Sequence, residues 1–193
     1  MKNSIPALTP FLRSDAQGLM LARLYLFPDR EFTLTELAAA AAVSVASTMR
    51  EVDRLVESDY LLERRVGRSR LVRVNTEHAL FKPMSEVLIY AYGPQAVIHK
   101  MVQGLANLKE AYIYGSWAAR IQGHPGPDPQ DVDVLLIGEI SMRQTAELSS
   151  QASLTLGRPV NQVLVSSKDW EEASSSFLKT VKSSPLLKIE VSS

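Results

Sequence analysis

The chain has 193 residues, no net formal charge and 46% hydrophobic residues, which allows one large or two small domains with a real core. It has no cysteine, so disulfides, thiol chemistry and zinc–cysteine sites are excluded. Residues 1–10, MKNSIPALTP, lack the apolar segment of a signal peptide, and no stretch approaches the roughly 20 apolar residues of a membrane helix. We therefore expect a cytoplasmic protein with no membrane partner.

The first predicted elements are an amphipathic helix and a short alanine-rich helix. Residues 15–27 place apolar side chains at helical spacing, which is typical of a helix with one buried side. Residues 31–33 form a short extended segment. Thr33 stands three residues before Glu36, a capping-box pattern that predicts a helix over 34–41.

A third helix is predicted over 45–58, with Ser44 as its cap. Its outer side is polar and includes Ser47 and Arg50. Two short helices separated by a tight turn, the second polar on its outer side, are typical of a helix-turn-helix. We expect one buried apolar stripe on the third helix, made of Val45, Met49, Val52, Leu55 and Val56.

An arginine-rich β-hairpin is predicted next. Residues 60–66 and 70–74 resemble strands, and 67–69 resemble a turn. A hairpin in this position is a plausible wing, and its positive charge suits contact with DNA phosphates. The arginines are Arg64, Arg65, Arg68, Arg70 and Arg73.

The run TLTELAAAAAVSVASTMREVDRLVESDYLLERRVGRSRLVRVN, residues 33–75, resembles winged helix-turn-helix domains of the ArsR-like kind. The resemblance implies that helix 45–58 enters the major groove of double-stranded DNA and that the hairpin contacts the backbone. The alternative is a winged helix used for dimerisation or protein contact. The DNA-contacting residues implied are Ser44, Ser47 and Arg50 near base edges, and Arg68 near phosphate. From the local charge of the hairpin we also expect Arg64, Arg65 and Arg70 to contact DNA.

Residues 1–75 thus form the expected DNA-binding domain, and residues 76–106, largely helical with a break at 93–94, connect it to a second domain over 107–193. The connecting helices could pair with their copy, so a homodimer is expected. The second domain alternates strands and helices, which predicts a mixed α/β sheet flanked by helices. The expected elements are strands 111–114, 131–138 and 160–165, helices 116–121, 141–156 and 168–181, and a loop over 122–130.

The candidate chemistry of the second domain lies at Gly115-Ser116 and at Asp131 and Asp133. Side chains alternate along a strand, so the two carboxylates point to the same side. Like charges so close are unfavourable unless something positive lies between them, and Mg²⁺ accompanied by phosphate is the usual answer. Alternatively, backbone N–H groups or Arg120 satisfy the pair. Arg120 is also a candidate contact for a nucleotide phosphate.

The run YGSWAARIQGHPGPDPQDVDVLLIG, residues 114–138, resembles the nucleotidyltransferase superfamily (the DNA polymerase beta superfamily), in particular its minimal bacterial members. The resemblance implies that Asp131 and Asp133 are catalytic residues that bind Mg²⁺ or Mn²⁺ with a nucleoside triphosphate. It also implies that Gly115 and Ser116 contact phosphates. An attacking hydroxyl would then displace pyrophosphate.

The sequence departs from this family at the third carboxylate. Active members commonly carry one on a neighbouring strand, but the candidate strand, 160–165, offers only Asn161 and Gln162. An amide is not a general base and is a weaker metal ligand. We therefore expect a DNA-binding regulator whose second domain binds nucleotide and Mg²⁺ and is weakly active or inactive.

Two alternatives stay open. The protein could be an active Mg²⁺-dependent nucleotidyltransferase of the antitoxin type, which modifies a hydroxyl of a partner protein or RNA. It could also be a non-catalytic antitoxin that binds a protein encoded nearby.

Overall fold

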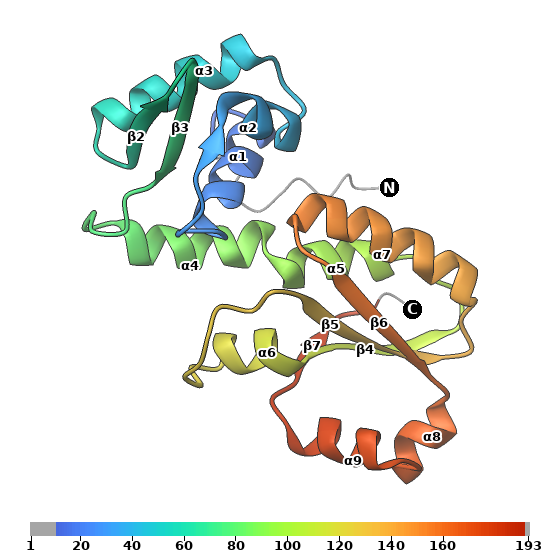
Figure 1. The fold of residues 1–193 in the computed structure, drawn as a ribbon. Helices are drawn as coiled ribbons and strands as arrows, with labels where there is room; N and C mark the ends of the chain where they lie inside the picture. Colours follow the sequence, from blue (N-terminus) through green and yellow to red (C-terminus); the bar gives the residue numbers. More distant parts are fainter. Residues whose placement is uncertain (1–10, 192–193) are drawn as a thin grey trace. The chain divides into compact units, whose positions relative to one another are not determined.

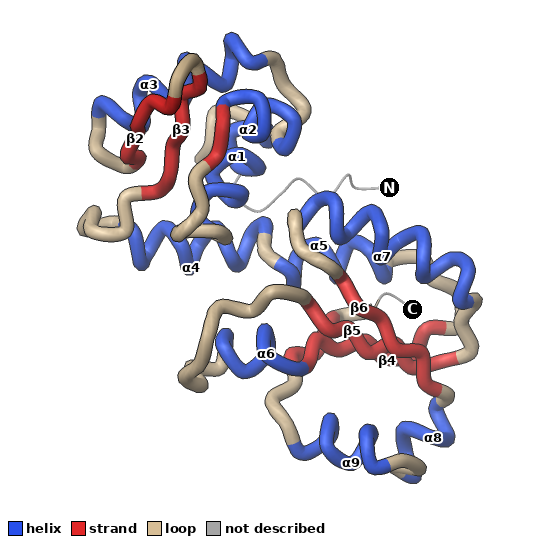
Figure 2. Tube along the Cα trace, viewed as in Figure 1, coloured by secondary structure: helices blue, strands red, loops and turns tan. Residues whose placement is uncertain are grey.

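A computed structural model of the chain describes residues 11–191, and the chain divides into two compact units, Met1–Gly93 and Pro94–Ser193 (Figure 1). The predicted absence of a signal peptide concerns residues 1–10, which lie outside the described range. Within that range, no helix is both long and apolar enough to cross a membrane. Both units contain helices and strands (Figure 2), as the predicted α/β class requires.

Short helices and a small sheet make up the first unit. Thr33 Oγ1 accepts from the backbone N–H of Glu36 at 3.2 Å, and the Glu36 carboxylate accepts from the N–H of Thr33 at 2.8 Å. This capping box, together with the Ser44 cap of α3, confirms the predicted helix starts. The elements are α1 (Asp15–Tyr25), β1 (Phe32–Thr33), α2 (Leu34–Ala40), α3 (Val45–Glu57), β2 (Leu61–Val66), β3 (Ser69–Val74) and α4 (Phe81–Tyr92).

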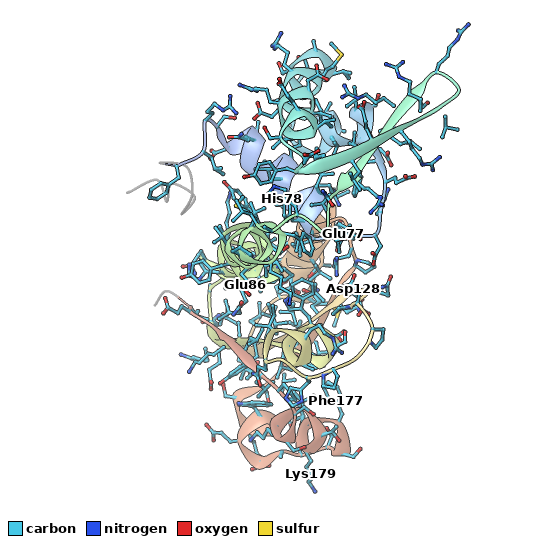
Figure 3. All side chains as sticks on the ribbon, turned by 90° about the vertical axis from the view of Figure 1, so that its left-hand side faces the viewer. Glu77, His78, Glu86, Asp128, Phe177 and Lys179 are labelled. Atoms are coloured by element: carbon cyan, nitrogen blue, oxygen red, sulfur yellow. The ribbon has the colours of Figure 1, made fainter. Side chains whose placement is uncertain are left out.

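The three strands of this unit form an antiparallel sheet in the order β1-β3-β2. Val66 is paired with Ser69, so Gly67 and Arg68 alone make the turn of the β2–β3 hairpin. Gly67 has a φ of 58°, a left-handed conformation that glycine adopts at little cost. Figure 3 shows the hairpin projecting beyond the helices of the unit. A helix-turn-helix followed by such a hairpin is a winged helix-turn-helix, the fold predicted for this part of the chain.

The buried side of α3 differs from the predicted stripe. Val52 is fully buried, and so is Thr48, which the predicted stripe does not include. Val45 and Met49 are instead each 45% exposed. They lie next to Thr48 and Val52 around the helix, at the edge of the covered side. Periodicity alone does not show where that edge falls.

The second unit is a four-stranded sheet in the order β6-β5-β4-β7, in which β5 and β6 are parallel and the other pairs antiparallel. In Figure 1, α5 and α7 lie on one face of the sheet, and α8 and α9 lie on the other. This is the predicted mixed sheet flanked by helices. The elements are α5 (Pro94–Val102), β4 (Leu108–Tyr114), α6 (Gly115–Ile121), β5 (Val132–Gly138), α7 (Met142–Leu156), β6 (Val160–Val165), α8 (Ser167–Glu172), α9 (Ser176–Ser183) and β7 (Leu187–Ile189).

Side chains of β5 alternate between the two covered faces. Leu135 and Ile137 pack against buried residues of α8 and α9. Val134 and Leu136, both fully buried, point to the opposite face. By the same alternation Asp133 lies on the α8–α9 face, near the start of the strand.

Three features differ from the predicted elements. The helix predicted over 168–181 is two helices, because Ala173 adopts a left-handed φ of 47° and ends α8, after which Ser175 caps α9. The sequence does not predict β7, which has only three residues and pairs with β4. The segment 76–106, predicted to connect two domains, is divided between the units: α4 belongs to the first and α5 to the second.

Candidate functional site

The two predicted metal ligands lie at the start of β5. Asp131 comes just before the strand, and Asp133 is its second residue. In the parallel β5–β6 pair, Asp133 is the register partner of Asn161. Asn161 Nδ2 donates to Asp131 Oδ2 at 2.8 Å and to Asp133 Oδ1 at 3.3 Å. One amide group therefore bridges both carboxylates.

The Gly-Ser turn at the end of β4 contacts this pair. Gly115 has a φ of 71°, a conformation in which a side chain is strained. A Cβ at this position would lie 2.5 Å from Asp133 Oδ2, which is closer than real contacts allow. The close approach of the turn to the carboxylate therefore requires glycine. Ser116, the next residue, is exposed in the first turn of α6.

One aromatic side chain lies beside the carboxylates, and a second packs against it. Tyr114, the last residue of β4, is the antiparallel partner of Asp133. Its ring packs edge-to-face on Phe177 of α9, with 5.9 Å between the ring centroids. In Figure 3, Phe177 lies on the side of α9 that faces the sheet, whereas Lys179 points away from it. Sequence reasoning missed Phe177, because only the fold brings α9 to the end of β4.

The charge of the carboxylate pair is not balanced by a basic side chain of the described residues. Among residues 11–191, neither Asp131 nor Asp133 forms an ion pair. Burial raises the pKa of Asp133, and the Asp131 charge adds to the rise, while the hydrogen bond from Asn161 opposes it. Burial, followed by the charges of Asp133 and Asp131, raises the pKa of the Tyr114 phenol to about 12. The site therefore favours an incoming positive charge.

The residues present fit Mg²⁺ when it arrives with phosphate. Proteins commonly hold Mg²⁺ through one or two carboxylates, with waters and substrate phosphates completing the coordination. Asp131 and Asp133 meet that requirement. The described residues contain no group of three or more acidic or histidine side chains, which an all-protein site would need. Rotation of the Asn161 amide would present its oxygen to a cation in place of the N–H donor.

Replacing Asp133 by asparagine is expected to stabilise the folded chain, because it removes one of two adjacent negative charges and keeps an acceptor for Asn161. The expected rise in Tm at neutral pH is up to about 5 °C. Folding raises the pKa of Asp133, so the protonated form of this residue stabilises the folded chain. That stabilisation is complete at pH values below the ordinary pKa of 3.8 and is lost as the pH rises. The gain from the substitution should therefore vanish in acid.

Thermal unfolding of both proteins across pH measures this difference. Asp128→Asn, in an exposed loop, is the matched control and should leave Tm unchanged. A lower Tm for Asp133→Asn at neutral pH would mean that the hydrogen bonds from the Asn161 amide to the two carboxylates stabilise the fold more than the repulsion between the carboxylates destabilises it.

Arg120 lies outside the carboxylate site. Its Nη1 donates to the backbone carbonyl of His124, and its guanidinium lies against Gly126, where a Cβ would come within 2.3 Å of Nη2. The described structure gives it no bond to either aspartate. The alternative in which Arg120 satisfies the carboxylate pair is therefore not seen among the described residues, and its predicted contact with a nucleotide phosphate stays a prediction.

Two of the arginines predicted to contact DNA are paired with carboxylates. Arg64 donates through Nε to Glu31 at 2.6 Å, and its Nη2 forms an ion pair with the same group at 2.5 Å. Arg70 bridges Asp53 of α3 and Glu63 of β2, each at 2.5 Å. These contacts tie the hairpin to the rest of the unit and neutralise much of the charge of the two arginines.

The remaining predicted DNA contacts divide between the hairpin and α3. The side chains of Arg65 and Arg68 are exposed and have no ion-pair or hydrogen-bond partner among residues 11–191. On α3, the Ser44 hydroxyl accepts from the backbone N–H of Ser47 at 3.1 Å. Arg50 Nη2 donates to Ser47 Oγ at 3.3 Å. Free positive charge is therefore concentrated at the hairpin, with Arg50 on the exposed side of α3.

Comparison with known proteins adds weak likenesses, each to part of the chain. No protein-family model matches the chain, and a search of curated proteins found no match. The reduced form of MarR from E. coli is 24% identical over 43% of this chain and 62% of that one, with a TM-score of 0.34. A MarR variant from E. coli in complex with operator DNA is 21% identical over 46% and 62% of the two chains, with a TM-score of 0.35. A candidate nucleotidyltransferase from Sulfolobus solfataricus is 17% identical over 49% and 73%, with a TM-score of 0.31.

This chain spans less than two thirds of the length of the MarR chains it matches. The fold described above rests on its own strand order, register and helix caps.

Proposed function

We propose that the protein is a DNA-binding transcriptional regulator. The observation that supports this most is the pair of exposed, unpartnered arginines, Arg65 and Arg68, on a hairpin that follows a helix-turn-helix. Arg68 occupies the two-residue turn, where its side chain can reach a phosphate without displacing other groups. Phosphate contacts of this kind supply much of the affinity of DNA-binding proteins and orient the helix that meets the bases.

Titration of the full chain against a labelled promoter duplex at several salt concentrations tests the proposal. The logarithm of the association constant should fall linearly with the logarithm of salt concentration, by about 0.9 for each phosphate contacted. A duplex with the same composition but scrambled sequence separates specific from general binding. A flat salt response, or absence of binding at low salt, would overturn the proposal.

We propose further that the second unit binds a nucleoside triphosphate with Mg²⁺ or Mn²⁺, without efficient transfer. Support comes from Asp131 and Asp133, two carboxylates on one side of a sheet, beside the Gly115 turn, that pair with no basic side chain of residues 11–191. Bound Mg²⁺ would neutralise phosphate charge. Asn161 occupies the position of the third acid, and a neutral amide lacks the basicity to deprotonate an attacking hydroxyl. This argues for binding over turnover.

Calorimetry with each nucleoside triphosphate in Mg²⁺ and in Mn²⁺ tests this second proposal. Binding should require the metal and be lost in Asp131→Ala and in Asp133→Asn. Asp128→Asn, in an exposed loop, serves as the control. Metal-independent binding, or none with any triphosphate, would count against it. Label transfer from a radiolabelled triphosphate to the chain or to a partner would favour the active transferase instead.

A further inference from the structure

The hydroxyl groups at the start of α3 are engaged within the helix. The Ser44 hydroxyl caps the helix and also donates to Ser47 Oγ at 3.0 Å. Ser47 Oγ receives a further bond from Arg50. Thr48 is 1% exposed, and its hydroxyl donates to the Ser44 carbonyl. These serines are therefore poorly placed to read base edges, the role that the winged-helix resemblance implies for them.

Two apolar side chains are partly exposed at the same turn. Val45 and Met49 are each 45% exposed and lie one helical turn apart. Asp53, a further turn along, lies on the same side of α3 and is bound to Arg70 of β3. That side of the helix therefore faces the hairpin, which carries the arginines expected to meet phosphates. The covered part of the Val45 and Met49 side chains packs within the unit, and the exposed part presents apolar surface that suits a contact with a partner.

We infer that Val45 and Met49 read thymine by packing against its 5-methyl group in the major groove. This inference rests on the proposed DNA binding. The thymine methyl is the main apolar feature of the major groove, and side chains that lack hydrogen-bonding groups recognise it by contact. Arg50 on the same helix, with Arg65 and Arg68 on the hairpin, supplies the positive charge that would hold this apolar surface against DNA. The preferred site would then carry thymines where the first turn of α3 meets the bases.

Uracil substitution tests the inference, because deoxyuridine pairs like thymidine but lacks the methyl group. A preferred duplex is first selected from a random pool with the full chain. Each thymine is then replaced singly by uracil. Binding should weaken about fourfold at one or two positions, the effect of exposing one methyl-sized group. At these positions Met49→Ala or Val45→Ala should abolish the difference between thymine and uracil.

Met142→Ala is the matched control, since Met142 is an exposed methionine of the second unit. This variant should retain the full uracil penalty. The substituted side chains are exposed, so the variants should fold, and an unchanged Tm verifies this. Selection of no duplex at all would overturn the proposed DNA binding itself. Tight binding without a uracil penalty, or a penalty that survives in both α3 variants, would overturn the thymine contact alone.

Discussion

Replacing both Arg65 and Arg68 by alanine is expected to weaken DNA binding about thirtyfold at physiological salt. Each phosphate contact changes the salt slope by about 0.9, which corresponds to five- or sixfold in affinity near 0.15 M salt. The log–log slope of the double variant should therefore be smaller in magnitude by about two. Salt titration with a single labelled duplex measures both quantities.

The structure also predicts which arginine should matter less. Arg64 donates to Glu31 through two nitrogens, so the pair is close to neutral before DNA arrives. Arg64→Ala should change the slope by much less than one unit. Arg143→Ala, on the exposed surface of α7, is the matched control for loss of an arginine and should change neither quantity. Equal changes of the salt slope for Arg64→Ala and Arg68→Ala would show that the ion pair between Arg64 and Glu31 opens when DNA binds.

Arg70 gives a less direct test, although the sequence places it among the DNA contacts. Its side chain is only 18% exposed and bridges Asp53 and Glu63. Arg70→Ala would release two carboxylates beside the surface proposed to meet DNA. Binding should weaken because negative charge is uncovered there, and a double substitution with Asp53→Asn should recover part of the loss.

The helix starts of the first unit could be predicted because caps are local. Thr33 and Glu36 satisfy each other's backbone N–H groups three residues apart, so the sequence pattern contains the whole interaction. The exposure of Val45 and Met49 could not be predicted in this way. It depends on how far the neighbouring elements extend over α3, which is a property of the packed unit. The ion pairs of Arg64 and Arg70 depend in the same way on residues distant in the chain.

In the second unit, periodicity predicts the order of strands and helices. It does not predict where each element ends or where very short elements form. The sequence does not predict a left-handed conformation at Ala173, because alanine is the residue that most favours a continued helix. The strand β7 forms because its backbone pairs with the edge of β4. Alternation along β5 predicts that Asp131 and Asp133 share a side. The bridging role of Asn161 requires the parallel register of β5 and β6, which the sequence does not specify.

Replacing Asn161 by aspartate is expected to make folding stability strongly dependent on Mg²⁺. The substitution removes the N–H donor that bridges Asp131 and Asp133 and adds a third negative charge between them. Without divalent cation the variant should unfold at lower temperature than the natural chain. Added Mg²⁺ should reverse the loss, by about 2.7 kcal/mol when its concentration is a hundred times the dissociation constant. Thermal unfolding with increasing Mg²⁺, with EDTA as the zero point, measures both changes.

Gln151→Glu is the matched control, because it adds one carboxylate to the exposed side of α7 in the same unit. Its Tm should not respond to Mg²⁺. In the natural chain Asn161 already supplies a neutral partner to both aspartates, so Mg²⁺ alone should stabilise it little and Mg²⁺ with a triphosphate more. If Asn161→Asp gains nothing from Mg²⁺, the aspartates are a structural pair satisfied by the amide. A large gain would mean that the site binds Mg²⁺ without substrate once residue 161 is an acid. The amide of Asn161 would then be the feature that prevents such binding in the natural chain.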